Sequence, residues 1–302
     1  MKIVCAGTPE FATDIFLLIS KHHKILALIC QPDKPFGRKG ELKAPHTKAI
    51  FAPMGMEILQ PTYIDDAFSE YIKSLKPDII LVVAYGKILP QHFLDIAPCI
   101  NIHASILPSW RGASPLQQMI LSQMPYFGVS AMYMNERLDS GEILGISYVE
   151  NTQQNIIELS QQLAFHGANL ALYVLKHLQS IEPLKQIDAD SSYCAKIKKS
   201  CGCVQLDSAL DVYCAYLAYC VWPHIFIQSA NGYTLKFFDI SLEESTQTHK
   251  VGEILHIEST YIIVGCARGS LRIGSVQQEG KNKLQSPLYL RGKHLKVGDV
   301  LC

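Results

Sequence analysis

The sequence predicts an α/β domain built on an open, mostly parallel sheet, followed by a small β-barrel. Three features of the residue pattern lead to this prediction, and the length of the chain agrees with it. Strand-like and helix-like segments alternate as far as Ile181, and the most apolar run is of the kind that forms a buried parallel strand. Near the end, short strands follow one another without crossover helices. A chain of 302 residues is long enough for two such domains.

The alternation begins with the first residues of the chain. Lys2 to Ala6 is a short apolar run that predicts a strand. Thr8 and Pro9 follow as the N-cap and the first residue of a helix, and apolar residues then recur at helical spacing. We expect a second strand from Ile25 to Cys30. The segment 32–45, rich in Pro, Gly and Lys, is expected to be a mobile loop.

The later segments of the first domain continue the same pattern. Asp78 to Ala84 is the most continuous apolar run, as expected of a central strand that is covered on both faces. Further helices are expected at 47–54, 65–74 and 155–178, and further strands at 57–59, 100–102, 129–134 and 143–149. The result is a Rossmann-like sheet. In such sheets ligands bind beyond the carboxyl ends of the strands, so chemistry is expected there.

The pattern changes after Ile181. A helix is expected at 206–221, and short alternating strands at 225–229, 234–240, 261–264 and 270–273. This succession favours a small OB-like barrel. We therefore divide the chain into a first domain of residues 1–182, a linker of residues 183–203 and a C-terminal β-barrel of residues 204–302.

The charge composition limits how the protein could hold a polyanion. Lys and Arg together number 27, and so do Asp and Glu, so the net charge is zero. A nucleic acid would have to be held by a local patch, because only charges within about 10 Å of the phosphates act strongly. The chain enters a strand-like run at once and has no long apolar segment, so we expect no leader peptide, no membrane contact and a cytoplasmic location.

The ten cysteines indicate free thiols rather than a metal site. Four lie inside apolar runs, where a cysteine behaves as a small hydrophobic residue: Cys5, Cys30, Cys99 and Cys266. The closest pair, Cys201 and Cys203, has a poor spacing for zinc, and no CxxC pair occurs. We expect no metal.

The strand that ends at His103 is the strongest candidate for chemistry. Asn101 and His103 are two residues apart, so both side chains point to the same face at the carboxyl end of a strand. The mixed segment from Ala104 to Gly112 follows. An ordinary surface loop is the alternative there, but Trp110 and Arg111 beside a strand end favour the wall of a ligand site.

Asp139 is the third polar residue of interest. It lies in an Asp-Ser-Gly sequence between two strand-like segments, which is also a common turn signature. Facing His103, its carboxylate would orient the imidazole. The first turn of the chain, Gly7-Thr8-Pro9, is not GxGxxG, and no P-loop or HExxH motif occurs. A nicotinamide cofactor is therefore not indicated.

These motifs resemble the signature of the formyltetrahydrofolate-dependent formyltransferases. The segments Asn101 to Pro108, Arg111-Gly112 and Leu138 to Gly141 match it. The resemblance implies that Asn101, His103 and Asp139 form the catalytic set and that 10-formyltetrahydrofolate is the co-substrate, without a metal. It implies a folate-binding set of Ser105, Ile106, Leu107, Pro108 and Arg111, with Tyr85, Lys87, Ile88 and Leu89 walling the pteridine pocket.

Within the family the chain is most similar to the members that formylate methionyl initiator tRNA. Ala6 to Phe11, Gln31 to Pro35 with Gly37-Arg38, and the length of the C-terminal part indicate this. The resemblance implies tRNA contacts from Arg38, Lys39 and Lys43, for which a solvated charged loop is the alternative. The partners would be methionyl initiator tRNA and folate, and we expect a monomer.

Two features depart from the pattern of this family and concern its tRNA contacts. Where the family usually has several acidic residues and a tryptophan after the linker, the segment from Ser200 to Asp207 has one acidic residue and no tryptophan, and the C-terminal part is less basic than expected of a strong tRNA-holding domain. Sugar-nucleotide N-formyltransferases share the Asn-His-Asp set and the two-domain length, and they remain the alternative. A folate- or RNA-binding module with an inactive site is less favoured, because all three catalytic residue types are present.

Overall fold

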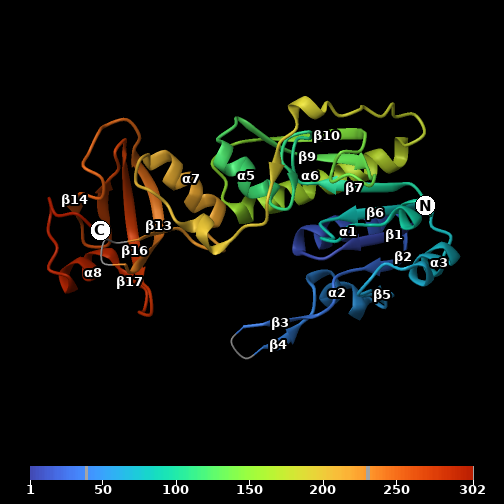
Figure 1. Ribbon diagram of the computed structural model, residues 1–302, viewed down its shortest axis with the longest axis horizontal. Helices are drawn as coiled ribbons and strands as arrows, with labels where there is room; N and C mark the ends of the chain where they lie inside the picture. Colours follow the sequence, from blue (N-terminus) through green and yellow to red (C-terminus); the bar gives the residue numbers. More distant parts are fainter. Residues whose placement is uncertain (38–39, 229–231, 302) are drawn as a thin grey trace. The chain divides into compact units, whose positions relative to one another are not determined.

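The computed structural model describes residues 1–37, 40–228 and 232–301 (Figure 1). The chain divides into two units, each formed by segments that are far apart in the sequence. Unit 1 comprises Met1–Pro115, Pro125–Glu150 and Leu159–Ala195. Unit 2 comprises Leu116–Met124, Asn151–Glu158 and Lys196–Cys302.

A seven-stranded sheet forms the centre of unit 1, in the order β10-β9-β7-β6-β1-β2-β5 (Figure 1). The strands are β1 (Lys2–Gly7), β2 (Lys24–Ile29), β5 (Ile58–Leu59), β6 (Ile79–Val83), β7 (Cys99–His103), β9 (Tyr126–Tyr133) and β10 (Ile143–Glu150). The five strands from β7 to β5 run parallel, whereas β9 runs antiparallel to both of its neighbours. This confirms the mostly parallel α/β sheet. All five residues of β6 are buried, as its apolar sequence predicts.

Helices cover both faces of the sheet, because alternate residues of each strand point to opposite faces and pack against different helices. They are α1 (Glu10–His22), α2 (His46–Phe51), α3 (Asp66–Ser74), α4 (Gln91–Leu94) and α6 (Ile156–His177). Val4, Ile80 and Cys99 pack with residues of α3 and α4. On β7, Ile102 points the other way: a Cβ added at Gly167 of α6 would lie 3.0 Å from its side chain. Because side chains alternate along a strand, Asn101 and His103 share the face of Cys99.

Two short pairings differ from the sequence prediction. The segment expected as a loop contains a hairpin of β3 (Lys34–Phe36) and β4 (Glu41–Lys43). The segment expected as a linker contains a 3₁₀ turn, η2 (Asp188–Asp190), and β11 (Tyr193–Cys194), which pairs in parallel with β8 (Arg111–Gly112). Such short strands leave no hydrophobic period, and the partners of the second pair lie far apart in the chain, so local patterns did not indicate them.

Unit 2 contains an antiparallel sheet in the order β12-β13-β16-β15-β14, with β17 beside β16. Its strands are β12 (Phe226–Gln228), β13 (Thr234–Glu244), β14 (Ile254–Ile257), β15 (Ile262–Gly265), β16 (Ser270–Gln278) and β17 (Leu284–Gln285). The remaining helices are α5 (Pro115–Ser122), η3 (Lys199–Gly202), α7 (Ala209–Tyr219) and α8 (Ser286–Gly292), with a further 3₁₀ turn, η1 (Ala52–Met54), in unit 1. Within the described residues β12 and β14 are not paired, so this is an antiparallel β domain without a closed barrel.

None of the helices within the described residues is both long enough and apolar enough to span a membrane.

Candidate active site

Three polar side chains meet where β7 leaves the sheet. Asn101 and His103 lie on β7 and are 7% and 6% exposed. Asp139 comes from the turn between β9 and β10. The side-chain amide of Asn101 donates to Oδ1 of Asp139 over 3.4 Å, and Nδ1 of His103 lies 3.7 Å from Oδ2. The structure thus brings together the three residues that the sequence singled out for catalysis.

The second ring nitrogen of His103 also faces an oxygen atom. Nε2 lies 3.0 Å from the backbone carbonyl oxygen of Trp110. A carbonyl can only accept, so Nε2 carries the proton in this contact. With a carbonyl on one side and the Asp139 carboxylate on the other, both nitrogens of the imidazolium form would have acceptors.

The turn that carries Asp139 is tightly constrained. Asp139 has a φ of 47°, in the left-handed region that disfavours residues with a side chain. A Cβ at Gly141 would overlap the carbonyl oxygen of Tyr133, so only glycine fits where the turn passes the end of β9. The backbone N–H of Gly112 donates to Oδ2 of Asp139 over 2.8 Å. The carboxylate therefore has a fixed place.

The loop after β7 is anchored to β9. The hydroxyl of Ser130 donates to the carbonyl of Ser105 over 2.7 Å and accepts from the backbone N–H of Leu107 at 3.0 Å. Ser105 and Leu107 are buried, whereas Ile106 and Pro108 are half-buried. Among the residues expected to bind folate from this loop, Ile106 and Pro108 therefore keep the larger accessible surface.

Arg111 is buried, whereas the sequence predicts it in the wall of a ligand site. Its side chain is fully buried, and its guanidinium donates to Oε1 of Gln186, to Oδ1 of Asp188 and to the hydroxyl of Tyr193. With its donors engaged by the protein, the guanidinium is placed to hold the loop rather than to contact a ligand directly. Hydrogen bonds from Arg137 and then from Arg111 hold the pKa of Asp188 below its usual value.

The residues after β6 are divided between the core and the surface. Tyr85 and Leu89 are buried, and burial raises the pKa of Tyr85 to about 12. Within the described structure the Tyr85 hydroxyl has no hydrogen-bond partner. Lys87 donates to the carbonyl groups of Pro61 and Thr62, each over 2.7 Å, and burial lowers its pKa. Ile88 is 84% exposed and is the member of this segment that is open to a ligand.

The hairpin β3–β4 extends from the side of the sheet at which β2 ends (Figure 1). Lys43 is exposed on β4, whereas Arg38 and Lys39 lie outside the described residues. The ammonium group of Lys48 donates to both carboxylate oxygens of Asp33 over 2.9 and 2.8 Å, and to Gln60 over 2.8 Å. Hydrogen bonds from Gln60 and then Lys48 hold the pKa of Asp33 below its usual value. The base of the hairpin is therefore fixed.

Sequence reasoning did not find Gln186, Tyr193 or the surrounding segment, which contact this site from the expected linker. Gln186 is a buried polar residue in a stretch without hydrophobic period, and its partners are far away in the sequence. Only the tertiary fold shows that this segment passes beside Asp139.

In the part of the chain that the structure describes, no group of three or more His, Cys, Asp or Glu side chains is placed to hold a metal ion. The cysteines there are free. Burial raises the pKa of Cys99 and of Cys266 to about 12, so these thiols stay protonated.

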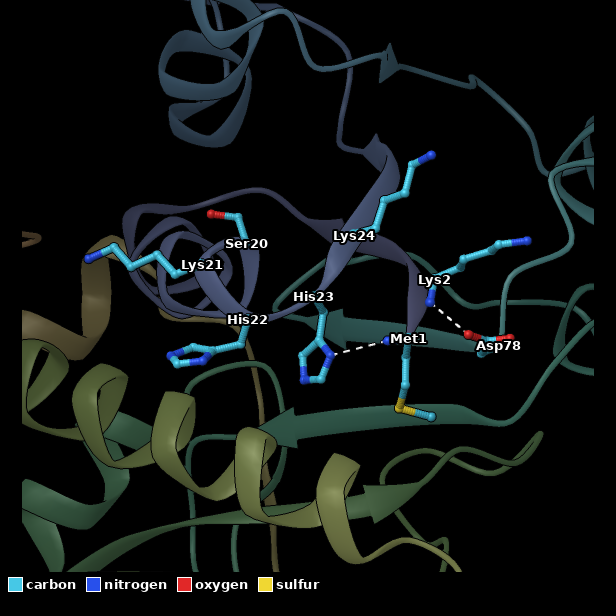
Figure 2. Close-up of a pocket in the computed structure, with 8 residues that line it drawn as sticks. All are labelled: Met1, Lys2, Ser20, Lys21, His22, His23, Lys24 and Asp78. Atoms are coloured by element: carbon cyan, nitrogen blue, oxygen red, sulfur yellow. Dashed lines mark hydrogen bonds between the residues drawn. The ribbon is translucent and has the colours of Figure 1, made fainter.

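A separate shallow pocket lies at the amino ends of β1 and β2 (Figure 2). It is lined by Met1, Lys2, Ser20, Lys21, His22, His23, Lys24 and Asp78. The terminal ammonium group lies 3.4 Å from Nδ1 of His23, and the backbone N–H of Lys2 donates to Asp78 over 2.7 Å (Figure 2). These groups are at the end of the sheet opposite to His103.

Comparison with known families covers most of the chain. Residues 1–175 match the family described as formyl transferase, and residues 196–294 match the family described as formyl transferase, C-terminal domain. A methionyl-tRNA formyltransferase of Helicobacter acinonychis is 44% identical over 100% of both chains. The enzyme of the same name from Wolinella succinogenes is 43% identical over 100% of this chain and 99% of its own.

Solved structures with the same fold are more distant in sequence. WlaRD, a sugar 3N-formyl transferase solved in the presence of dTDP and 5-N-formyl-THF, has a TM-score of 0.67 and is 15% identical over 93% of this chain and 99% of its own. A methionyl-tRNA formyltransferase from Clostridium thermocellum has a TM-score of 0.55 and is 18% identical over 88% of this chain and 100% of its own. At these identities the likeness concerns the fold.

Proposed function

The chain belongs to the formyl transferase family, and from this premise we propose that it transfers the formyl group of 10-formyltetrahydrofolate to the amino group of methionyl initiator tRNA. Relatives that share more than two fifths of its residues over their whole length carry the matching name. The structural observation that carries the proposal is the meeting of Asn101, His103 and Asp139 at the carboxyl end of β7.

Formyl transfer is an acyl transfer between two nitrogen atoms. The free amine attacks the formyl carbon, a new N–C bond forms, and the bond from that carbon to N10 of the folate breaks. Negative charge develops on the formyl oxygen, and one proton must pass from the attacking nitrogen to the departing one. A site for this reaction needs a donor for the oxygen and a group that carries the proton.

Asn101 and His103 supply donors for the developing charge. The Asn101 amide is bound to Asp139 only over a long 3.4 Å contact, so one of its N–H groups is available to the formyl oxygen. The imidazolium form of His103 would add a second donor if its Nε2 N–H exchanged the Trp110 carbonyl for the formyl oxygen. Removal of one donor of this kind typically raises a barrier by about 3 kcal/mol.

Asp139 is suited to carry the proton. Its carboxylate lies between the two donors and is fixed by the Gly112 N–H. It would accept the proton from the attacking amine, directly or through a water molecule. The His103 imidazolium would give its own proton to the departing nitrogen and then be reprotonated from Asp139. The side chain is 11% exposed, which leaves a narrow opening to a substrate.

Folate and tRNA would be held by different parts of the chain. We propose that Ile88, Ile106 and Pro108 bound the pteridine site, and that Tyr85, Leu89, Ser105 and Leu107 support it from the core. Lys43 on the hairpin would contact tRNA, together with Arg38 and Lys39, for which the sequence predicts the same role.

The remaining assignments complete the proposal. Residues 1–182 would form the catalytic domain, 183–203 the connection and 204–302 the tRNA-binding domain, whose sheet would be a relative of the OB barrel. The β-bulge between Leu242 and Glu244 supports this, because bulges increase the coiling of a sheet. We propose a monomeric, metal-independent enzyme of the cytoplasm.

The test is formyl transfer by the purified protein from 10-formyltetrahydrofolate to charged initiator tRNA, with amino-sugar nucleotides as competing acceptors. We expect transfer to the tRNA, at a kcat/KM that exceeds the value for each sugar nucleotide by orders of magnitude. The same rate with a sugar nucleotide, and none with tRNA, would assign the chain to the sugar-modifying branch instead.

A further inference from the structure

The side chain of Gln186 lies behind the turn that carries Asp139, and the protein uses both ends of its amide. Nε2 donates to the backbone carbonyl of Asp139 over 3.0 Å and to that of Gly141 over 2.7 Å. Oε1 accepts from Nε and Nη2 of Arg111 at 3.0 and 2.8 Å. A primary amide offers two N–H donors and two acceptor positions, so these contacts use its whole capacity.

The Asp139 turn needs such support. Asp139 has left-handed backbone geometry, and Gly141 passes against the end of β9. Strained backbone of this kind persists only where its surroundings hold it. By binding the carbonyl groups on either side of Ser140, Gln186 fixes the path of the turn and with it the direction of the Asp139 side chain.

Arg111 connects this support to the second anchor of Asp139. Its buried guanidinium holds Gln186, and its backbone N–H donates to the carbonyl of Ser192 over 2.8 Å in the pairing of β8 with β11. The next residue, Gly112, donates its N–H to the Asp139 carboxylate. The two residues of β8 therefore hold Asp139 in two ways. Arg111 acts on its main chain through Gln186, and Gly112 binds its carboxylate directly.

The network also has a link to the surface. Asp188 accepts from Nη1 of Arg111 over 3.0 Å and from Nη2 of Arg137 over 2.8 Å. A buried guanidinium is costly unless its charge is compensated, and Asp188 supplies that compensation. The segment after Pro183 therefore contributes to the active site rather than serving only as a connection.

We propose that Gln186 is a positioning residue for formyl transfer: it holds the Asp139 carboxylate toward Asn101 and His103. It does not touch a substrate in this account and acts only through Asp139. The kinetic part of the inference rests on the proposed function, whereas the structural part does not.

The variant Gln186→Met keeps the length of the side chain and removes its donors and its acceptor. We expect kcat for formyl transfer to fall about 10- to 100-fold, because a small displacement of a catalytic group costs about 100-fold. KM for folate and for tRNA should stay within about twofold, because Gln186 contacts neither substrate in this account. The matched control is Lys185→Met, a change at the exposed neighbour, which should leave kcat unchanged.

A second variant separates the loss of the hydrogen bonds to the Asp139 turn from a general loss of folding. Gln186→Glu keeps acceptors for Arg111, with which it would form a buried ion pair, but it has no N–H to give to Asp139 and Gly141. It should show the same loss of kcat. Circular dichroism and thermal unfolding verify that each variant is folded at the assay temperature.

The deciding readout is the ¹H–¹⁵N NMR spectrum of the substrate-free protein. If Gln186 positions Asp139, the amide resonance of Gly112 and the side-chain amide of Asn101 shift in both variants and stay in place in Lys185→Met. A fall in kcat without these shifts would overturn the inference, and so would unchanged kcat in a folded variant. Absence of transfer by the wild-type protein would reject the proposed function alone, because the spectra need no substrate.

Discussion

The two ends of the parallel sheet hold similar side chains in different surroundings. At the amino end, His23 contacts the terminal ammonium group and the exposed Asp78 binds the backbone of Lys2 (Figure 2). At the carboxyl end, His103 and Asp139 are nearly buried and converge with Asn101. We therefore propose an active site only at the carboxyl end, where the histidine and the aspartate are nearly buried as well as close together. Buried polar groups with convergent, mutually fixed contacts are the better sign.

Chain connections explain the difference. At the amino end, α1 passes into β2 through His23 alone, so this connection is too short to fold over the pocket. At the carboxyl end, the segments 104–112, 134–142 and 184–195 all return to β7 or to one another. His23 has a lowered pKa, chiefly because of burial and then because of the positive terminal ammonium group, so it is mostly neutral near pH 7.

The largest effect is expected for His103→Ala. Loss of a charged donor beside the formyl oxygen should lower kcat/KM for formyl transfer by about 100- to 1,000-fold. Steady-state kinetics at saturating folate would measure the change, with the folded state verified by circular dichroism. Near wild-type turnover in His103→Ala would show that the histidine at the carboxyl end is no more important for the reaction than His23 at the amino end.

A smaller effect is expected for Lys48→Met at the base of the hairpin. Without the bonds from Lys48 to Asp33 and Gln60, the residues at the base of the hairpin should become mobile. We therefore expect KM for tRNA to rise several-fold, while KM for folate stays unchanged. The measurement is steady-state kinetics with each substrate varied in turn. An equal rise in both KM values would show that the hairpin base is not specific to tRNA.

The same variant makes a prediction about pH. Asp33 has a lowered pKa in the folded protein, so its contacts stabilise the fold above the ordinary carboxyl pKa, and this stability is lost as pH falls through the lowered value. The Tm of the wild type should therefore exceed that of Lys48→Met near neutral pH, and the gap should close in acid. A gap that is constant with pH would exclude the ion pair as its cause.

The smallest effect is expected for His23→Ala at the amino end. Because this side chain is far from the converging segments, kcat/KM should stay within about twofold of wild type. A loss similar to that of His103→Ala would mean that the pocket of Figure 2 takes part in the reaction.

Sequence patterns predicted what depends on local periodicity. The buried run of β6 and the spacing of Asn101 and His103 on β7 were readable, because strands alternate with a period of two. The contacts of Arg111 were not, because Gln186 is 75 positions away and no hydrophobic period marks either residue. The short pairing of β8 with β11 was missed for the same reason.

A single-turnover comparison shows whether Asn101, His103 and Asp139 act as one unit in formyl transfer. Each residue is replaced by Ala alone and all three together, and the rate of formyl transfer to charged initiator tRNA is measured with both substrates bound. Groups that act as a unit are strongly non-additive, so we expect the triple variant to be within about tenfold of the slowest single variant. If the three losses multiply instead, the three residues act independently and do not form one catalytic unit.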